Sequence, residues 1–215
     1  MASHALLPIP WPACVCACMV AAVALLASSS PPAAAASRSL AAAAGSSGAE
    51  PTLGFTEVSL SESNFSLQRP YDVPSGDRYR FAGGVRRLWV LRSDKPHQRQ
   101  SNTSPRTEIR MTGYDYSSGV WQFEGYGYVP SGTTGVSIMQ VFGGAGDSGP
   151  ATTLMLHVYD GALRYYDRQV VEYGICDRWF RLNVVHDVGG STVTVFVDGV
   201  ERLRAPGRGG HGSCS

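Results

Sequence analysis

Residues 152–159 read Thr-Thr-Leu-Met-Leu-His-Val-Tyr, and the dipeptide Asp160-Gly161 follows them directly. From residue 154 onward, Leu, Leu and Val occupy every second position, and Met, His and Tyr occupy the positions between them. Side chains alternate between the two faces of a β-strand, so this pattern predicts a strand with one buried face. Asp-Gly favours a tight hairpin, and we expect residues 163–166 to return as the partner strand.

The chain beyond residue 50 repeats this organisation, with short alternating runs between turn residues and no sustained helical period. Gly125 and Gly127 share one face of a predicted strand, which hints at a close backbone approach or a bend. Many short strands with frequent turns predict an all-β sandwich of the jelly-roll type. We expect strands at residues 79–91 (with a turn at Gly83-Gly84), 121–129, 136–142, 152–159, 163–166, 179–188, 192–198 and 200–203.

The first 52 residues do not resemble a folded domain. Residues 14–27 are an unbroken run of apolar and small residues, too short for a comfortable membrane span but typical of a secretory signal. We predict a signal peptide at 1–27, with cleavage anywhere up to about residue 44, and a low-complexity linker at 28–52. A transit peptide or a retained anchor is the alternative. Residues 53–210 then form one domain, and 211–215 a divergent tail.

The secretory pathway would deliver the protein either outside the cell, in the cell wall, or to the vacuole. After the signal, no apolar stretch is long enough to cross a membrane. The net charge of +1 predicts neither nucleic acid nor an acidic membrane surface as partner. Cys176 and Cys214 follow the signal and could pair, and no Cys or His cluster has the spacing of zinc ligands. We expect no metal and no cofactor.

Two acceptor triplets for N-glycosylation occur, at Asn64 and at Asn102. Asn102 lies in a polar stretch that is typical of an exposed loop, although Pro105 directly after its triplet disfavours its use. Asn64 precedes Phe65 and is expected to be partly covered.

Residues 105–110 read Pro-Arg-Thr-Glu-Ile-Arg and are the strongest functional signal. In a strand, Arg106, Glu108 and Arg110 stand on one face. Two guanidinium groups held apart by a carboxylate form a rigid donor array suited to a carboxylate ligand. The plainer alternative is a solvated strand face with cross-strand ion pairs.

From residue 106 onward the sequence resembles the plant citrate-binding-protein family, which is similar to the alginate-lyase-2 domain of polysaccharide lyase family 7. The resemblance covers roughly residues 55–210 and implies a concanavalin-like β-jelly roll. It rests on the stretches 105–110, 113–116 (Gly-Tyr-Asp-Tyr), 121–126 (Trp-Gln-Phe-Glu-Gly-Tyr), 138–142 (Ile-Met-Gln-Val-Phe), 154–159, 177–183 (Asp-Arg-Trp-Phe-Arg-Leu-Asn) and 198–200 (Asp-Gly-Val).

The chain departs from the lyase pattern at two places. The resemblance implies a Gln-Ile/Val-His strand, but here Gln140-Val141 is followed by Phe142, so Phe occupies the position of the histidine. It also implies a final strand with a Tyr-Phe-Lys-x-Gly-type motif. The chain stops where that strand should begin, and we expect a jelly roll without it.

A polyuronate lyase must neutralise a carboxylate and supply a base and an acid. Phe142 cannot move a proton, so we identify no catalytic residue and expect a secreted binding module rather than an enzyme. Its ligand would be an acidic oligosaccharide or a citrate-like polycarboxylate. Arg106, Arg110 and Gln140 would bind carboxylates, and Glu108 would orient the arginines. A polyuronate lyase acting by β-elimination and a non-functional truncated isoform are the alternatives.

A few other polar residues are candidates for minor roles. Tyr126 or Tyr128 could in principle replace the missing acid, although sheet tyrosines more often pack or stack on sugars. His157 shares a face with Met155 and Tyr159; it could line a ligand groove, but we favour the interpretation as a plain surface histidine. Arg164, Arg178 and Arg181 are interpreted as surface or structural residues.

Overall fold

The computed structural model describes residues 15–27, 50–143, 151–208 and 213–214. The predicted cleavage window and almost the whole predicted linker lie outside these ranges, as does part of the predicted tail. Within them, no α-helix forms, and no helix has the length and hydropathy needed to cross a membrane.

The described residues form strands and two short 3-10 turns. The strands are β1 (Val15–Ala27), β2 (Thr56–Val58), β3 (Phe65–Gln68), β4 (Tyr79–Ala82), β5 (Val85–Leu91), β6 (Glu108–Met111), β7 (Val120–Tyr128), β8 (Val136–Phe142), β9 (Thr152–Tyr159), β10 (Ala162–Tyr165), β11 (Gln169–Glu172), β12 (Trp179–Asp187), β13 (Thr192–Val197), β14 (Val200–Pro206) and β15 (Ser213–Cys214). The turns are η1 (Glu62–Asn64) and η2 (Ser75–Asp77).

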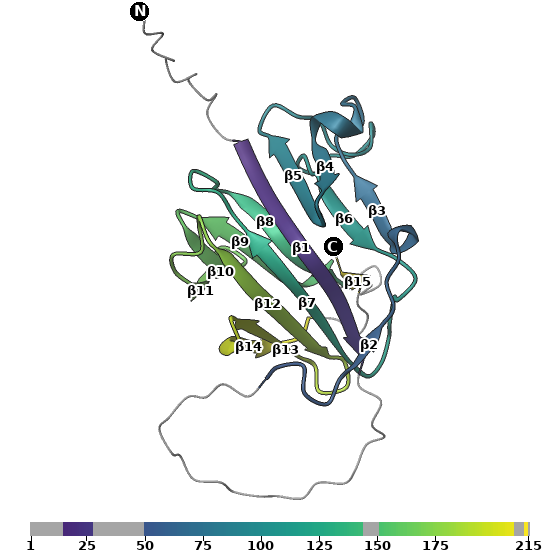
Figure 1. The fold of residues 1–215 in the computed structure, drawn as a ribbon, viewed down its shortest axis with the longest axis vertical. Helices are drawn as coiled ribbons and strands as arrows, with labels where there is room; N and C mark the ends of the chain where they lie inside the picture. The colour runs from purple at the N-terminus through teal and green to yellow at the C-terminus, as the bar shows by residue number, and fades with distance from the viewer. Residues whose placement is uncertain (1–14, 28–49, 144–150, 209–212, 215) are drawn as a thin grey trace, which may run out of the picture.

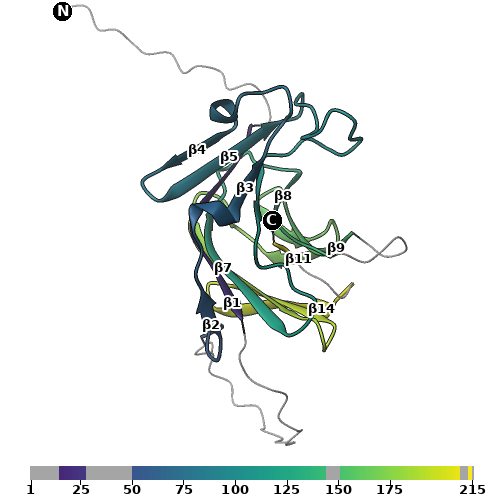
Figure 2. The same ribbon diagram turned by 90° about the vertical axis from the view of Figure 1, so that its right-hand side faces the viewer.

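These strands pair antiparallel into two main layers, which confirms the predicted all-β sandwich. The larger sheet has the order β14-β13-β12-β7-β1-β5-β4, with β2 beside β1. The smaller sheet has the order β11-β10-β9-β8-β15, and β3 pairs with β6 as a separate ribbon. Figure 1 shows the large sheet across the viewed face, and Figure 2 shows the layer of β8, β9 and β11 beside the layer of β1 and β7.

The structure confirms each strand predicted from alternation. The run at 79–91 divides into β4 and β5 at Gly83-Gly84, as the turn residues predict. The β9–β10 hairpin turns at Asp160 (φ 51°) and Gly161 (φ 76°), the left-handed pair that a two-residue hairpin requires. The strands β2, β3 and β11 were not predicted from the sequence. Each has only three or four residues, which is too short for alternation alone to reveal a strand.

The core lies between the two main sheets. The apolar face of β9 supplies Leu154, Leu156 and Val158, which are all 0 % exposed. The facing strands contribute Phe180, Leu182, Val184, Val193, Val195 and Val197. Burying a side chain of this size stabilises the fold by about 1.5–3 kcal/mol, so these residues dominate the stability.

A glycine on β7 lets the aromatic ring of Phe180 approach the backbone. A Cβ atom placed on Gly127 would lie 2.8 Å from Cζ of Phe180, which is 1 % exposed. No side chain fits there unless the ring moves, so the expected close approach is confirmed at this position. β12 pairs with β7 as its antiparallel neighbour, with Phe180 opposite Gly127 in the register.

The apolar run predicted to be a signal peptide forms the inner strand β1 in this structure. β1 pairs antiparallel with β5 on one side and with β7 on the other, and its end also pairs with β2. Figure 1 shows it in purple between them. In the described part of the chain, β1 is the strand that joins the β4–β5 hairpin to the rest of the large sheet.

The predicted divergent tail contributes the two-residue strand β15. Ser213 pairs with Phe142 and Cys214 pairs with Val141 of β8, and β15 also lies against β6. β15 therefore occupies the space between β8 and β6.

The position of β1 predicts that residues 1–49 matter to stability. A chain that begins at Glu50 leaves the facing edges of β5 and β7 without their pairing partner, and a row of unpaired backbone groups is costly. We expect the shortened chain to melt at a lower temperature and to associate more readily than the full chain. Thermal unfolding with light scattering tests this. Equal melting temperatures and equal solubility would mean that β5 and β7 close the sheet without β1.

Candidate functional site

A groove of about 480 Å³ lies on the face of β8 and β9 that points away from the core. β6 and the loop before it form one wall, the end of β5 adds to the rim, and the turn before β8 closes one end. The groove is lined by Val90, Leu91, Arg92, Ser104, Pro105, Arg106, Thr107, Glu108, Thr134, Gly135, Val136, Ser137, Gln140, Met155, His157 and Tyr159.

Glu108 is the centre of the polar groups in this groove. Nη1 of Arg106 donates to its Oε1 at 3.1 Å, and Nε2 of Gln140 donates to its Oε2 at 3.0 Å. Arg106 and Glu108 come from the wall and Gln140 from the floor, so the carboxylate connects β6 to β8. The side chains of Arg106 and Glu108 are 29 % and 22 % exposed, which leaves them within reach of a ligand.

The structure brings three of the four predicted ligand-binding residues together. Arg110 is the exception: it does not line the groove, and its Nη2 pairs with Asp115 at 3.2 Å. β6 begins only at Glu108, so Arg106 precedes the strand rather than standing within it. Phe142 lies at the end of β8, past a register shift, and is 48 % exposed outside the groove lining.

The polar face of β9 supplies residues that sequence reasoning undervalued. His157 and Tyr159 line the groove, and the hydroxyl of Tyr159 lies 3.4 Å from Nδ1 of His157. Of the two interpretations of His157, the structure supports the less favoured one: it lines the groove and is half-buried, and burial lowers the pKa of its imidazole. Alternation placed both residues on one face, but only the layering of the strands turns that face into a groove.

The two tyrosines considered as substitute acids lie elsewhere. Tyr126 and Tyr128 belong to β7 of the large sheet, and neither lines the groove. Tyr128 packs against Trp179, with ring centroids 5.6 Å apart, and Tyr126 is 41 % exposed.

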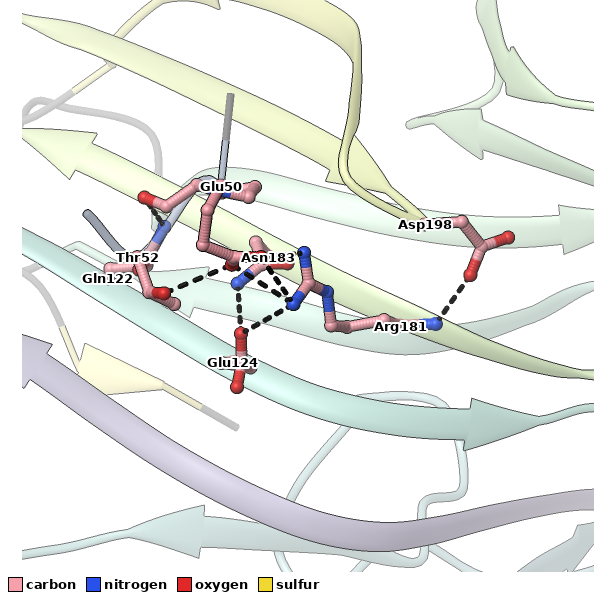
Figure 3. Close-up of polar contacts among 8 residues, drawn as sticks. Glu50, Thr52, Gln122, Glu124, Arg181, Asn183 and Asp198 are labelled. Carbon is pink, nitrogen blue, oxygen red and sulfur yellow. Dashed lines mark hydrogen bonds and ion pairs between the residues drawn. The ribbon is translucent and has the colours of Figure 1, made fainter. Parts of the chain in front are cut away.

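Arg178 and Arg181 have structural roles on the large sheet, as expected. Arg181 pairs with Glu50 at 3.0 Å and lies 3.9 Å from Glu124, which also accepts a hydrogen bond from Asn183 at 2.8 Å. Figure 3 shows these side chains over β7 and β12. Arg178 pairs with Asp198 at 2.7 Å.

The remaining predicted sites differ in their accessibility. Asn102 is exposed, whereas the side chain of Asn64 donates to the carbonyl of Thr112 at 2.9 Å and accepts from the backbone N–H of Ser61 at 2.8 Å. Cys176 is a free, half-buried thiol whose pKa burial raises. Among the described residues, no group of His, Cys, Asp or Glu side chains could hold a metal ion.

Comparison with known proteins shows the family to which the chain belongs. The alginate lyase family model matches residues 58–212, so the chain belongs to that family. A curated relative, the citrate-binding protein of Hevea brasiliensis, is 54 % identical over 155 residues, which are 72 % of this chain and 64 % of the relative. The chain thus spans somewhat less than two thirds of that relative's length. No solved structure matches the chain.

Two buried histidines predict how stability depends on pH. Burial lowers the pKa of His157 and of His186, whose Nδ1 lies 3.0 Å from the hydroxyl of Tyr116. The unfolded chain therefore binds more protons just below the ordinary pKa of 6.5. We expect the free energy of unfolding to fall as the pH falls below that value, and His157→Gln to flatten part of the slope.

Urea denaturation on both sides of pH 6.5 measures this effect. The hydrogen-bonded Arg78 guanidinium holds the pKa of the Asp94 carboxylate below 3.8. Asp94 therefore changes the free energy of unfolding only at a lower pH than the histidines do, and the two effects can be measured separately. A free energy of unfolding that stays constant through the histidine window would contradict the prediction.

Proposed function

We propose that this protein is a secreted binding module for carboxylate-bearing ligands, either an acidic oligosaccharide or a citrate-like polycarboxylate, and not an enzyme. The observation that supports the proposal is the groove of Arg106, Glu108 and Gln140. Arg106 keeps free guanidinium donors after its bond to Glu108, and two parallel donors match the two oxygens of a carboxylate.

The balance of charge in the groove also favours an acidic ligand. Arg92 and Arg106 line it, and Glu108 is the acidic residue in the lining. Gln140 holds the Glu108 carboxylate in place through its amide, and Arg106 supplies the opposite charge at 3.1 Å. The family name and the name of the Hevea relative point to uronate polymers and to citrate, and both classes carry carboxylates.

The case against catalysis rests on Phe142. It occupies the position where the lyase pattern has histidine, and it lies outside the groove lining. One observation favours the alternative, a polyuronate lyase. Tyr159 and His157 line the groove within 3.4 Å of each other, and such a pair can transfer protons. The activity assay below decides between the two.

We predict that the chain binds without cleaving. Titration calorimetry with oligoglucuronate, oligomannuronate and citrate is the measurement. Arg106→Ala should weaken binding by about 2–4 kcal/mol, because it removes a half-buried, charge-assisted contact. Arg204→Ala is the matched control, since Arg204 is 60 % exposed on β14 and pairs with Glu201. Raising the salt concentration should weaken binding further.

Two outcomes would overturn this proposal. Unsaturated uronate ends that accumulate during incubation with polyuronate would establish a lyase. Binding of none of the three ligands by a folded, monodisperse wild-type protein would remove the carboxylate-binding function.

We also propose entry into the secretory pathway, followed by residence in the cell wall or the vacuole. The apolar run at 14–27 supports this proposal. Cleavage of that run would remove the residues of β1, so processing and completion of the large sheet compete for the same segment. If it is removed, the edges of β5 and β7 must find another partner.

A reporter fused after Ala49 should enter the secretory pathway, and glycosidase should shift the mobility of the full-length product. We expect the glycan on Asn102, because the amide of Asn64 is committed to Thr112. Asn102→Gln should abolish the shift, whereas Asn64→Gln should leave it in place and lower stability instead. A reporter that stays in the cytosol and unprocessed would contradict the proposed compartment.

A further inference from the structure

The polar face of the small sheet continues past β9 onto β10. Arg164 of β10 stands directly opposite His157 of β9 in the antiparallel register. Directly opposed residues in an antiparallel pair share one face of the sheet, with Cβ atoms about 5 Å apart. Leu163, the neighbour of Arg164, is 0 % exposed on the core face, so Arg164 lies on the same sheet face as the groove, next to His157 but outside the groove lining.

Both of these neighbouring side chains hold a buried nitrogen without a partner. Nε of Arg164 and Nε2 of His157 are buried, and neither has a hydrogen-bond partner among the described residues. A buried donor that is left unpaired costs about 1–3 kcal/mol. Two such donors on opposed residues of one sheet face indicate an absent acceptor that both can reach.

The surroundings determine what kind of acceptor fits. Nδ1 of His157 lies 3.4 Å from the hydroxyl of Tyr159. When that hydroxyl donates to Nδ1, the neutral imidazole carries its proton at Nε2 and offers it as a donor. The rings of Tyr159 and Tyr166 flank the imidazole, with centroids at 5.8 Å and 6.5 Å. Ser137 of β8 stands opposite His157 on the other side.

The charged groups near His157 leave a positive balance. Arg164 is a permanent cation, and Arg208 lies over the ring of Tyr166. Asp167 is the acidic group that acts on His157, and it lies 3.8 Å from Arg168. Among these groups, the cations outnumber the carboxylate, and the unpaired nitrogens belong to Arg164 and to the neutral His157.

We propose that Arg164 and His157 form a second anion-binding position, which takes another carboxylate of the ligand held by Arg106 and Gln140. This inference rests on the proposed function, because the same ligand occupies both positions. It narrows the ligand to a linear oligouronide, with one acidic group at the wall and another beside β10.

The spacing of the strands supports this choice of ligand. Gln140 lies on β8 and Arg164 on β10, two strand spacings away, so the backbones of the two positions are about 10 Å apart. The carboxylates of an acid as small as citrate lie closer together than that. A chain of several uronate residues has the length to reach both positions.

The test compares ligands of two sizes on matched variants of the full chain. Wild-type protein, Arg164→Gln and His157→Gln are titrated with tetraglucuronate and with citrate. We expect Arg164→Gln to weaken tetraglucuronate binding on the order of ten-fold and to leave citrate binding unchanged. Arg178→Gln is the control, because Arg178 pairs with Asp198 on the large sheet, away from the groove.

Two further measurements keep the test decisive if a variant folds poorly. In wild-type protein, the nuclear magnetic resonance signals of Arg164 Nε–H and His157 Nε2–H should shift on addition of tetraglucuronate but not of citrate. Tetraglucuronate should also bind more tightly as the pH falls, because an adjacent carboxylate favours the charged imidazole. His157→Gln should reduce that dependence.

The outcomes separate this inference from the proposed function. If wild-type protein binds neither ligand, the proposed function fails and this inference fails with it. If wild-type protein binds tetraglucuronate and Arg164→Gln binds it equally well, with no shift at either nitrogen, the second position is overturned while the first stands. In that case, water alone satisfies the two donors.

Discussion

The alternation of side chains along β9 is the constraint on which both the fold and the groove depend. Leu154, Leu156 and Val158 close the core between the sheets, and Met155 and His157 stand on the opposite face of the same strand. A shift of one residue in the register would expose the core face and bury the polar face, and the large cost of that exchange fixes the pairing. The geometry of the groove is thereby tied to the stability of the sandwich, because one strand serves both.

Electrostatics gives the groove its character as a binding surface. Glu108 holds Arg106 and Gln140 with its two oxygens, so the positions of these two side chains are fixed before any ligand arrives. Under the proposed function, a groove with one fixed carboxylate and two arginines would discriminate by the number and spacing of a ligand's acidic groups. Tyr159 in the groove lining and Tyr166 beside it place aromatic rings next to His157, and such rings suit sugars better than a bare small acid.

The N-terminal apolar run has two incompatible uses. As β1 it joins the β4–β5 hairpin to β7 through pairing on both of its edges, whereas cleavage as the proposed signal would remove it. The same property, an uninterrupted run of small and apolar residues, suits an inner strand and a membrane-targeting segment alike. The large sheet of this chain therefore depends on the fate of one segment, while the small sheet that carries the groove does not contain it.

Local patterns in the sequence determined most of the strands and the hairpin at Asp160-Gly161, because these depend on neighbours within a few residues. Only the tertiary structure decided which polar faces meet. It separated Arg110 from the groove by pairing it with Asp115, it placed Tyr126 on the other sheet, and it brought His157 beside Arg164. Alternation with a period of two residues predicts that one face of a strand is polar. Whether that face lines a groove or open surface depends on the long-range packing of the sheets.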